Sequence, residues 1–234
     1  MLSLGSPRIM SSPLPDPTEG LIFLPGASGN RRLWKPVADG ISHPGPQRFL
    51  GWPGFGGVPE DPSVTGLGDL VSRVVDAMTE RVVLFAQSMG GIIALRAALE
   101  APERVRSIVL SVSSGGIDVH ALGAFDWRPD FVAANPTTPR WFLDANDDLT
   151  HRLREITVPV LLLWGDADPI SPVAVGKRLE HLLPDAELVV VPGGTHDLAS
   201  DRASEVLPHI ERHLRRPASA AQASEPNHDE FPRR

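Results

Sequence analysis

The sequence predicts an α/β fold in which helices flank a mostly parallel central sheet, and three observations support this prediction. Short, continuous runs of aliphatic and β-branched residues recur along the chain, as in Leu21–Leu24 and Val160–Trp164. Amphipathic segments alternate with these runs, and loops rich in glycine and polar residues follow them. Uninterrupted apolar strands are typical of a sheet that is buried on both faces. Their alternation with helices indicates βαβ units.

The predicted strands are short and buried, and Gln47–Leu50 (QRFL) is the least apolar of them. In chain order they are Leu21–Leu24, Gln47–Leu50, Val82–Phe85, Ile108–Val112, Val160–Trp164 and Glu187–Val191.

Helices are expected between and after these strands. Met89–Glu100 carries apolar residues at helical spacing. A later helix is predicted to begin with Ser171 as its N-cap and Pro172 in its first position. The segment Asp201–Leu214 is also helical in pattern, although Pro208 within it implies a kink or a late start.

Residues 115–155 interrupt the alternation of strands and helices. This stretch contains a glycine pair, several prolines and five aromatic residues. Long irregular segments in compact domains are often lids or binding elements. We therefore predict a small cap or lid here, inserted into a single domain that spans residues 20–216.

The two ends of the chain have a different composition. Residues 1–19 are rich in proline and serine and are expected to lie loosely on the surface. Residues 217–234 are small, polar and without periodicity, so we predict a disordered tail.

Composition excludes several classes of function. The net charge is −7 without a basic stripe, which gives no electrostatic basis for binding nucleic acid or an anionic membrane. Cysteine is absent, so disulfides, thiolate metal sites and a cysteine nucleophile are excluded. No secretory h-region or long apolar run occurs, and a cytoplasmic protein acting on small molecules is expected.

Reactive residues follow three of the predicted strands. Ser88 lies in FAQSMGG, Asp166 and Asp168 lie in WGDADP, and His196 lies in GGTHD. In open α/β sheets the ligand site lies at the carboxyl ends of the strands. A serine, an acid and a histidine are therefore expected to meet at one edge of the sheet.

With these motifs in this order, the sequence resembles the α/β-hydrolase superfamily, and in particular its compact, cofactor-free serine esterase-like members. The motifs extend from about Leu21 to Leu214. The resemblance implies the α/β-hydrolase fold, a Ser-His-Asp catalytic triad, and neither a cofactor nor a metal. The sequence itself contains no H-E-x-x-H motif, no P-loop and no G-x-G-x-x-G after a predicted strand.

The family's nucleophile elbow has the pattern G-x-S-x-G, and here the first glycine is replaced by Ala86. The positions two before and two after the serine must be small because the strand and helix backbones approach each other there. Alanine is the next smallest residue, and Gly90 is intact. The departure therefore preserves the geometry, and Ser88 is predicted to be the nucleophile.

A serine hydroxyl needs a base, and the base in turn needs an acid to orient it. His196 is the predicted base, whereas His181, His209 and His213 fall in helices and are expected to be solvated. The resemblance implies that Asp168, which precedes a proline, is the triad acid. Asp166, two residues earlier, remains the alternative.

The predicted oxyanion hole consists of two backbone N–H groups. The residue after the nucleophile, Met89, supplies one of them. The resemblance implies Ala27 as the other donor, in the loop after the first strand. Relatives often have a His-Gly pair before this donor, and Pro25 replaces that histidine here.

Aromatic residues are candidates for shaping an acyl or alcohol pocket, with core packing as the alternative for each. They are Trp34, Trp127, Phe131 and Trp141.

The predicted reaction is cleavage of carboxylic esters with small to medium acyl or alcohol groups through an acyl-enzyme. Alternatives are cleavage of thioesters, cleavage of carbon–carbon bonds with Arg128 and Arg140 holding an anionic substrate, and ligand binding without catalysis.

Overall fold

A computed structural model describes residues 16, 18–145 and 147–217 of the 234-residue chain. The predictions for residues 1–15 and for the tail after residue 217 therefore lie outside the described residues. In the described part, no helix is long and apolar enough to span a bilayer.

All strands are parallel and form one sheet in the order β2-β1-β3-β4-β5-β6. Their bounds are β1 Gly20–Leu24, β2 Gln47–Phe49, β3 Val82–Gln87, β4 Val105–Ser111, β5 Val160–Gly165 and β6 Ala186–Val191. Every residue of β1, β3, β4 and β5 is buried, while the edge strands β2 and β6 are partly exposed. The predicted mostly parallel sheet is thus confirmed.

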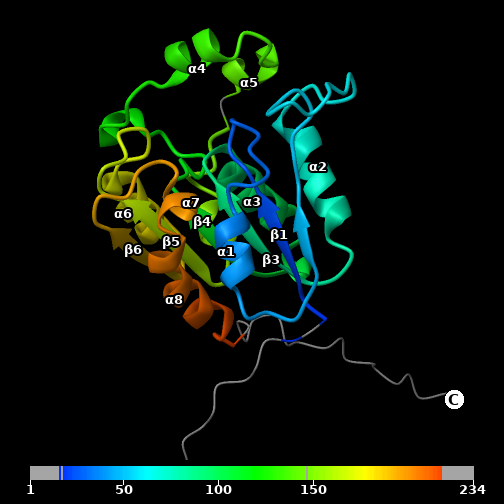
Figure 1. Cartoon of the computed structure of the whole chain (residues 1–234), viewed down its shortest axis with the longest axis vertical. Coiled ribbons are helices and arrows are strands. Elements are labelled where there is room, and N and C mark those ends of the chain that lie inside the picture. The colour runs from blue at the N-terminus through cyan, green and yellow to red at the C-terminus, as the bar shows by residue number, and fades with distance from the viewer. Residues whose placement is uncertain (1–15, 17, 146, 218–234) are drawn as a thin grey trace, which may run out of the picture.

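Helices cover both faces of this sheet (Figure 1). Helices α2 (Leu67–Ala77) and α3 (Met89–Glu100) pack against each other, and α3 also contacts β1, β3 and β4. On the opposite face lie α1 (Lys35–Gly40), α7 (Leu198–Asp201) and α8 (Ala203–Leu214), while α6 (Val173–Leu182) packs on β5 and β6. Two 3₁₀ turns, Pro102–Arg104 and Leu153–Glu155, precede β4 and β5.

Two helix boundaries differ from the predicted ones. Pro172, rather than Ser171, is the N-cap of α6, because the Ser171 hydroxyl accepts a hydrogen bond from the Trp164 indole at 3.2 Å instead of capping the helix. The predicted helix Asp201–Leu214 is divided at Arg202 into α7 and α8, with Pro208 inside α8.

Among its described residues, the segment predicted as a cap holds short helical elements. They are a 3₁₀ turn at His120–Leu122, α4 (Arg128–Ala134), α5 (Arg140–Asp144) and the 3₁₀ turn Leu153–Glu155. Helices α4 and α5 lie beyond the carboxyl ends of the strands (Figure 1). The segment is therefore placed over the sheet edge where the candidate residues emerge, and its action as a lid stays a prediction.

Candidate active site

Ser88 occupies a strained turn between β3 and α3. Its backbone has φ 52° and ψ −121°, a combination that L-residues rarely adopt. The Ser88 N–H donates to the carbonyl of Ser111 at 3.0 Å, which ties the turn to the end of β4. Such strain persists only where the surroundings hold it, and it is commonly found at functional sites.

Small residues permit this turn. A Cβ added to Gly90 would lie 2.6 Å from the Pro25 carbonyl oxygen, and one added to Gly26 would lie 3.0 Å from Cβ of Ser88. Ala86 is fully buried next to this approach. The start of α3 therefore lies against the backbone at the end of β1, and the loop after β1 lies against the Ser88 turn.

His196 and Asp168 are brought together from the loops after β6 and β5. Nδ1 of His196 lies 2.8 Å from Oδ2 of Asp168, whose side chain is 0% exposed. The other carboxylate oxygen of Asp168 accepts the N–H of Ile170 at 2.8 Å. A buried carboxylate on Nδ1 favours the tautomer in which Nε2 is free to accept a proton.

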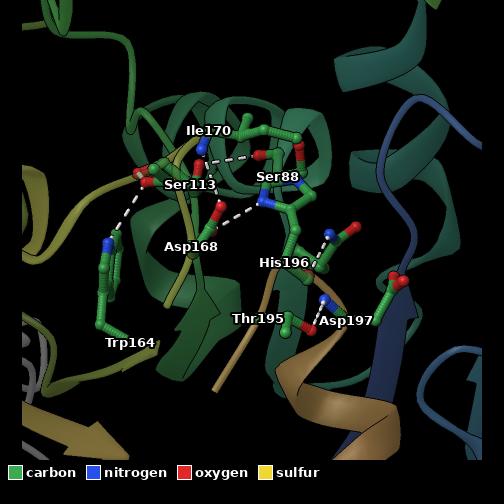
Figure 2. Close-up of polar contacts among 10 residues, drawn as sticks. Ser88, Ser113, Trp164, Asp168, Ile170, Thr195, His196 and Asp197 are labelled. Carbon is green, nitrogen blue, oxygen red and sulfur yellow. Dashed lines mark hydrogen bonds and ion pairs between the residues drawn. The ribbon is translucent and has the colours of Figure 1, made fainter. Parts of the chain in front are cut away.

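The imidazole of His196 lies next to Ser88, with Asp168 on its other side (Figure 2). None of the hydrogen bonds among the described residues joins the Ser88 hydroxyl to the ring. Catalytic hydrogen bonds of this kind are often long in the absence of substrate. The main-chain carbonyl of His196 accepts a hydrogen bond from the Gln87 amide at 3.1 Å, which links the histidine loop to the residue before the serine.

The two other nearby aspartates have different surroundings. Oδ1 of Asp166 accepts the N–H of Gly193 at 2.6 Å, so this carboxylate joins the loops after β5 and β6. Asp197 is exposed, and its N–H donates to the Thr195 hydroxyl at 3.4 Å. Of the three aspartates, Asp168 is the one that contacts the imidazole.

The N–H groups of Ala27 and Met89 donate to no protein acceptor in the described part of the chain. Met89 begins α3, so its N–H belongs to the unsatisfied first turn of that helix. An oxyanion hole requires two unpaired amides of this kind close to the nucleophile. Their role there remains a proposal.

Trp34 is a correction to the sequence prediction. It is 1% exposed, and its ring packs against Phe23 and Phe85 in the core rather than facing a cleft. Its indole N–H donates to the Leu24 carbonyl at 3.2 Å, and that of Trp52 donates to the Pro25 carbonyl at 2.9 Å. Trp34 therefore supports the loop that carries Ala27.

The other three predicted pocket residues form an aromatic cluster around Phe142. The cluster consists of Phe55, Trp127, Phe131, Trp141 and Phe142, with the ring centroids of Phe142 and Phe55 5.3 Å apart. Phe55 comes from the loop after β2, so its ring joins that loop to α4 and α5. Trp141 also borders a cleft of about 370 Å³ between residues 53–64 and 136–141.

The two arginines considered for an anionic substrate are paired within the cap. Arg128 lies 3.8 Å from Asp126, and its guanidinium lies 5.4 Å from the Trp127 ring. Arg140 lies 3.6 Å from Asp144, and its side chain is 89% exposed. Neither geometry favours a site that holds a carboxylate or dienolate.

Sequence reasoning missed several residues that build this site. Gln87 and Ser113 hold loops by hydrogen bonds, and Phe55 completes the aromatic cluster. Gln87 lies inside the elbow motif, which is a signal that could have drawn attention to it. Ser113 and Phe55 depend on tertiary contacts between distant segments. Among the described residues, no group of three or more His, Asp or Glu side chains is arranged to hold a metal.

Comparisons with known proteins indicate the family. A model described as "Alpha/beta hydrolase family" matches residues 21–152, and one described as "Serine aminopeptidase, S33" matches residues 131–203. The pimeloyl-[acyl-carrier protein] methyl ester esterase of Nitrosomonas europaea is 25% identical, and the match covers 75% of this chain and 88% of that protein.

Solved structures show the same fold. A bacterial membrane phospholipase A matches with a TM-score of 0.70 at 22% identity, over 84% of this chain and 78% of that one. Est816, described as an N-acyl homoserine lactone degrading enzyme, matches with a TM-score of 0.67 at 22% identity, over 83% and 92% of the two chains.

Proposed function

The chain belongs to the α/β-hydrolase family, and we propose that it is a serine esterase with Ser88, His196 and Asp168 as its catalytic triad. The observation that carries the proposal is the 2.8 Å contact between His196 Nδ1 and the buried Asp168 carboxylate, beside a serine on a strained elbow. Relatives named as methyl ester esterases support ester-bond hydrolysis as the type of reaction.

In the acylation step, Nε2 of His196 takes the proton of the Ser88 hydroxyl as Oγ attacks the ester carbonyl carbon. The carbonyl oxygen becomes an oxyanion that accepts hydrogen bonds from the N–H groups of Ala27 and Met89. The intermediate collapses as His196 returns the proton to the leaving alcohol. Asp168 orients the ring and stabilises its protonated form.

In the deacylation step, His196 takes a proton from water, and the resulting hydroxide equivalent attacks the acyl-enzyme carbonyl. The second oxyanion faces the same two amides, and its collapse gives the free acid and the Ser88 hydroxyl, which recovers its proton from His196. No cofactor or metal enters these steps. The triad needs only the substrate ester and water.

The proposed substrates are carboxylic esters with small to medium acyl or alcohol groups. The aromatic cluster around Phe142 supports this choice, since it provides apolar surface in the segment over the sheet edge. The cap arginines are engaged by their own aspartates, which does not favour a carbon–carbon hydrolase. Thioester cleavage uses the same triad and is separated from ester cleavage by experiment.

The test begins with a fluorophosphonate probe, which labels activated serines. Wild-type protein should be labelled at Ser88, Ser88→Ala should not react, and the matched control Ser72→Ala, on the exposed side of α2, should react like wild type. Absence of labelling in folded wild-type protein would favour a ligand-binding protein and would overturn the proposal.

The substrate class is tested with a series of p-nitrophenyl esters of increasing chain length beside acyl-CoA thioesters. Turnover that peaks at short or medium esters is the expected result. Rapid thioester cleavage with little turnover of any ester would leave the triad in place but would replace the proposed reaction.

A further inference from the structure

One peptide group links the proposed nucleophile to the proposed oxyanion hole. The carbonyl of Ser88 and the N–H of Met89 belong to the same planar unit. No cis peptide occurs among the described residues, so this N–H points away from the Ser88 carbonyl oxygen. Whatever holds the Ser88 carbonyl therefore also sets the direction of the Met89 N–H.

Two donors hold the Ser88 carbonyl. The N–H of Gly91 donates to it at 2.9 Å, which is a local bond within the first turn of α3. The hydroxyl of Ser113 donates to it at 2.7 Å, from a distant segment (Figure 2). The Ser113 oxygen in turn accepts the Gly115 N–H at 3.0 Å, which leaves its own proton directed to Ser88.

Backbone strain delivers Ser113 to this position. Val112 has φ 44°, in the left-handed region that β-branched residues rarely enter. On one side of Val112 the Ser111 carbonyl accepts the Ser88 N–H, and on the other side the Ser113 hydroxyl binds the Ser88 carbonyl. The strained turn after β4 thus clamps both polar groups of the Ser88 backbone.

The fit around Ser113 is close. Its side chain is fully buried, and a Cβ added to Gly91 would lie 2.2 Å from the Ser113 oxygen. Its main-chain carbonyl accepts the Ser171 hydroxyl at 3.5 Å, and Ser171 precedes α6 near the loop of Asp168. Ser113 therefore contacts both the nucleophile turn and a residue beside the acid loop.

We propose that Ser113 is a positioning residue for the oxyanion hole, acting through the Ser88–Met89 peptide. Its hydroxyl fixes the plane of that peptide and polarises it, which makes the Met89 N–H a stronger donor toward developing negative charge. The inference rests on the proposed serine esterase function. It assigns a catalytic consequence to a buried side chain that never touches the substrate.

The test compares Ser113→Ala with Ser107→Ala. Ser107 is the matched control, because it is equally buried in β4 and its hydroxyl has no hydrogen-bond partner in the described structure. The measurements are kcat and KM for a short p-nitrophenyl ester and inhibition by a trifluoromethyl ketone, which forms a tetrahedral adduct with an oxyanion.

Loss of an oxyanion donor costs about 10²–10³ in rate, so weakening one should lower kcat of Ser113→Ala by roughly ten-fold. KM should stay within about two-fold of wild type because the ground-state ester gains little from the hole, and trifluoromethyl ketone affinity should fall in parallel with kcat. Ser107→Ala should match wild type. A residue that only stabilised the fold would not lower kcat and trifluoromethyl ketone affinity together while leaving KM unchanged.

The outcomes separate the two proposals. If wild type reacts with the fluorophosphonate probe and Ser113→Ala keeps wild-type kcat and ketone affinity, the role of Ser113 is overturned and the esterase proposal stands. If folded wild type does not react with the probe, both fall. Should Ser113→Ala not fold, Ser113→Cys, whose thiol is a weak donor, should show the same fall in kcat at constant KM, and wild-type kcat in that variant would overturn the inference.

Discussion

Asp166 and Asp168 end the same strand, yet their carboxylates have different partners. Asp168 is buried against the His196 ring, whereas Asp166 accepts a main-chain N–H from Gly193. Residues two apart in a strand point to the same side, but these two residues lie in the turn after β5, where sequence spacing gives no direction. The sequence could therefore name both candidates, and tertiary contacts distinguish them.

Exchange of each aspartate for asparagine tests this distinction. Asp168→Asn should lower kcat/KM by about 10³–10⁴-fold, because the amide no longer stabilises the protonated ring or its tautomer. Asp166→Asn should lower it by less than about ten-fold, since the amide oxygen can still accept the Gly193 N–H. Kinetics with a short ester measures both. The reverse order would show that Asp166 is the acid.

Burial of individual side chains was the hardest property to read from the sequence. Trp34 was a pocket candidate and His213 was expected on a solvated face, but both are 1% exposed. Each lies in a helical region whose orientation depends on packing against the sheet. By contrast, Ser88, His196 and the pair Asp166 and Asp168 could be proposed as one site, because the carboxyl ends of parallel strands share one edge of the sheet.

At the scale of elements, the strand and the helix that flank Ser88 show how well the sequence pattern predicts the bounds of an element. Helix α3 has the predicted bounds, and β3 extends two residues further than predicted, to Gln87. Ala86, which replaces the motif's first glycine, is fully buried in β3, whereas a Cβ at Gly90 would lie 2.6 Å from the Pro25 carbonyl oxygen. The sequence identified the need for small residues, and the structure shows which position is the tightest.

Two glycines in the second position of their helices provide a matched test. A Cβ at Gly90 would meet the carbonyl oxygens of Pro25 and Leu24 at 2.6 and 2.9 Å, whereas a Cβ at Gly68 would have its nearest neighbour at 3.6 Å. Gly90→Ala should therefore lower the free energy of unfolding by about 1–3 kcal/mol and reduce kcat by displacing the elbow. Urea unfolding and ester kinetics measure the two effects.

Gly68→Ala is the control, and it should be neutral or stabilise the protein by up to about 1 kcal/mol, because alanine favours the helix. Equal behaviour of the two variants would contradict the close approach of α3 to the loop after β1.

The aromatic cluster connects α4 and α5 to the loop after β2, and Phe142 is at its centre. Phe142→Ala should cost about 3 kcal/mol locally, which would increase amide hydrogen exchange across residues 128–144 and change the preferred ester length. Phe125→Ala is the control, because that ring is 54% exposed and has no ring contact among the described residues. Unchanged exchange in Phe142→Ala would show that the cluster does not hold these helices.

At the scale of the whole molecule, different kinds of residue lie at the two ends of the parallel strands. The carboxyl edge carries the candidate catalytic groups, whereas a cluster of ionisable residues, most of them partly buried, lies near the amino ends of the strands. There the Arg106 guanidinium lies 3.3 Å from the Glu19 carboxylate and also donates to the main-chain carbonyl of Arg216. The guanidinium of Arg216 lies 2.6 Å from the Asp185 carboxylate. Burial raises the pKa of Glu19, since water is partly excluded from its carboxylate. The parallel topology could be predicted, but this cluster could not, because its members come from four separate segments.

His213 lies beside this cluster and should make stability, rather than catalysis, sensitive to acid. Burial, with Arg216 and Arg106 nearby, lowers the pKa of His213 to about 3, from the usual value of 6.5. Below pH 6.5 the unfolded chain binds a proton that the folded chain excludes, so the free energy of unfolding decreases as pH falls toward 3. Between pH 7 and pH 5 this single group should account for a loss of about 2 kcal/mol.

Replacement by leucine removes the titrating group while keeping an apolar side chain in the core. In urea unfolding at pH 7 and pH 5, His213→Leu should lose about 2 kcal/mol less than wild type between the two values. His209→Leu is the control, since His209 lies one turn earlier on α8 at a partly exposed position, and it leaves His213 to produce the wild-type loss. Equal acid sensitivity of wild type and His213→Leu would mean that the ring takes up its proton inside the folded protein. The cluster around Arg106 would then have to accommodate a further positive charge.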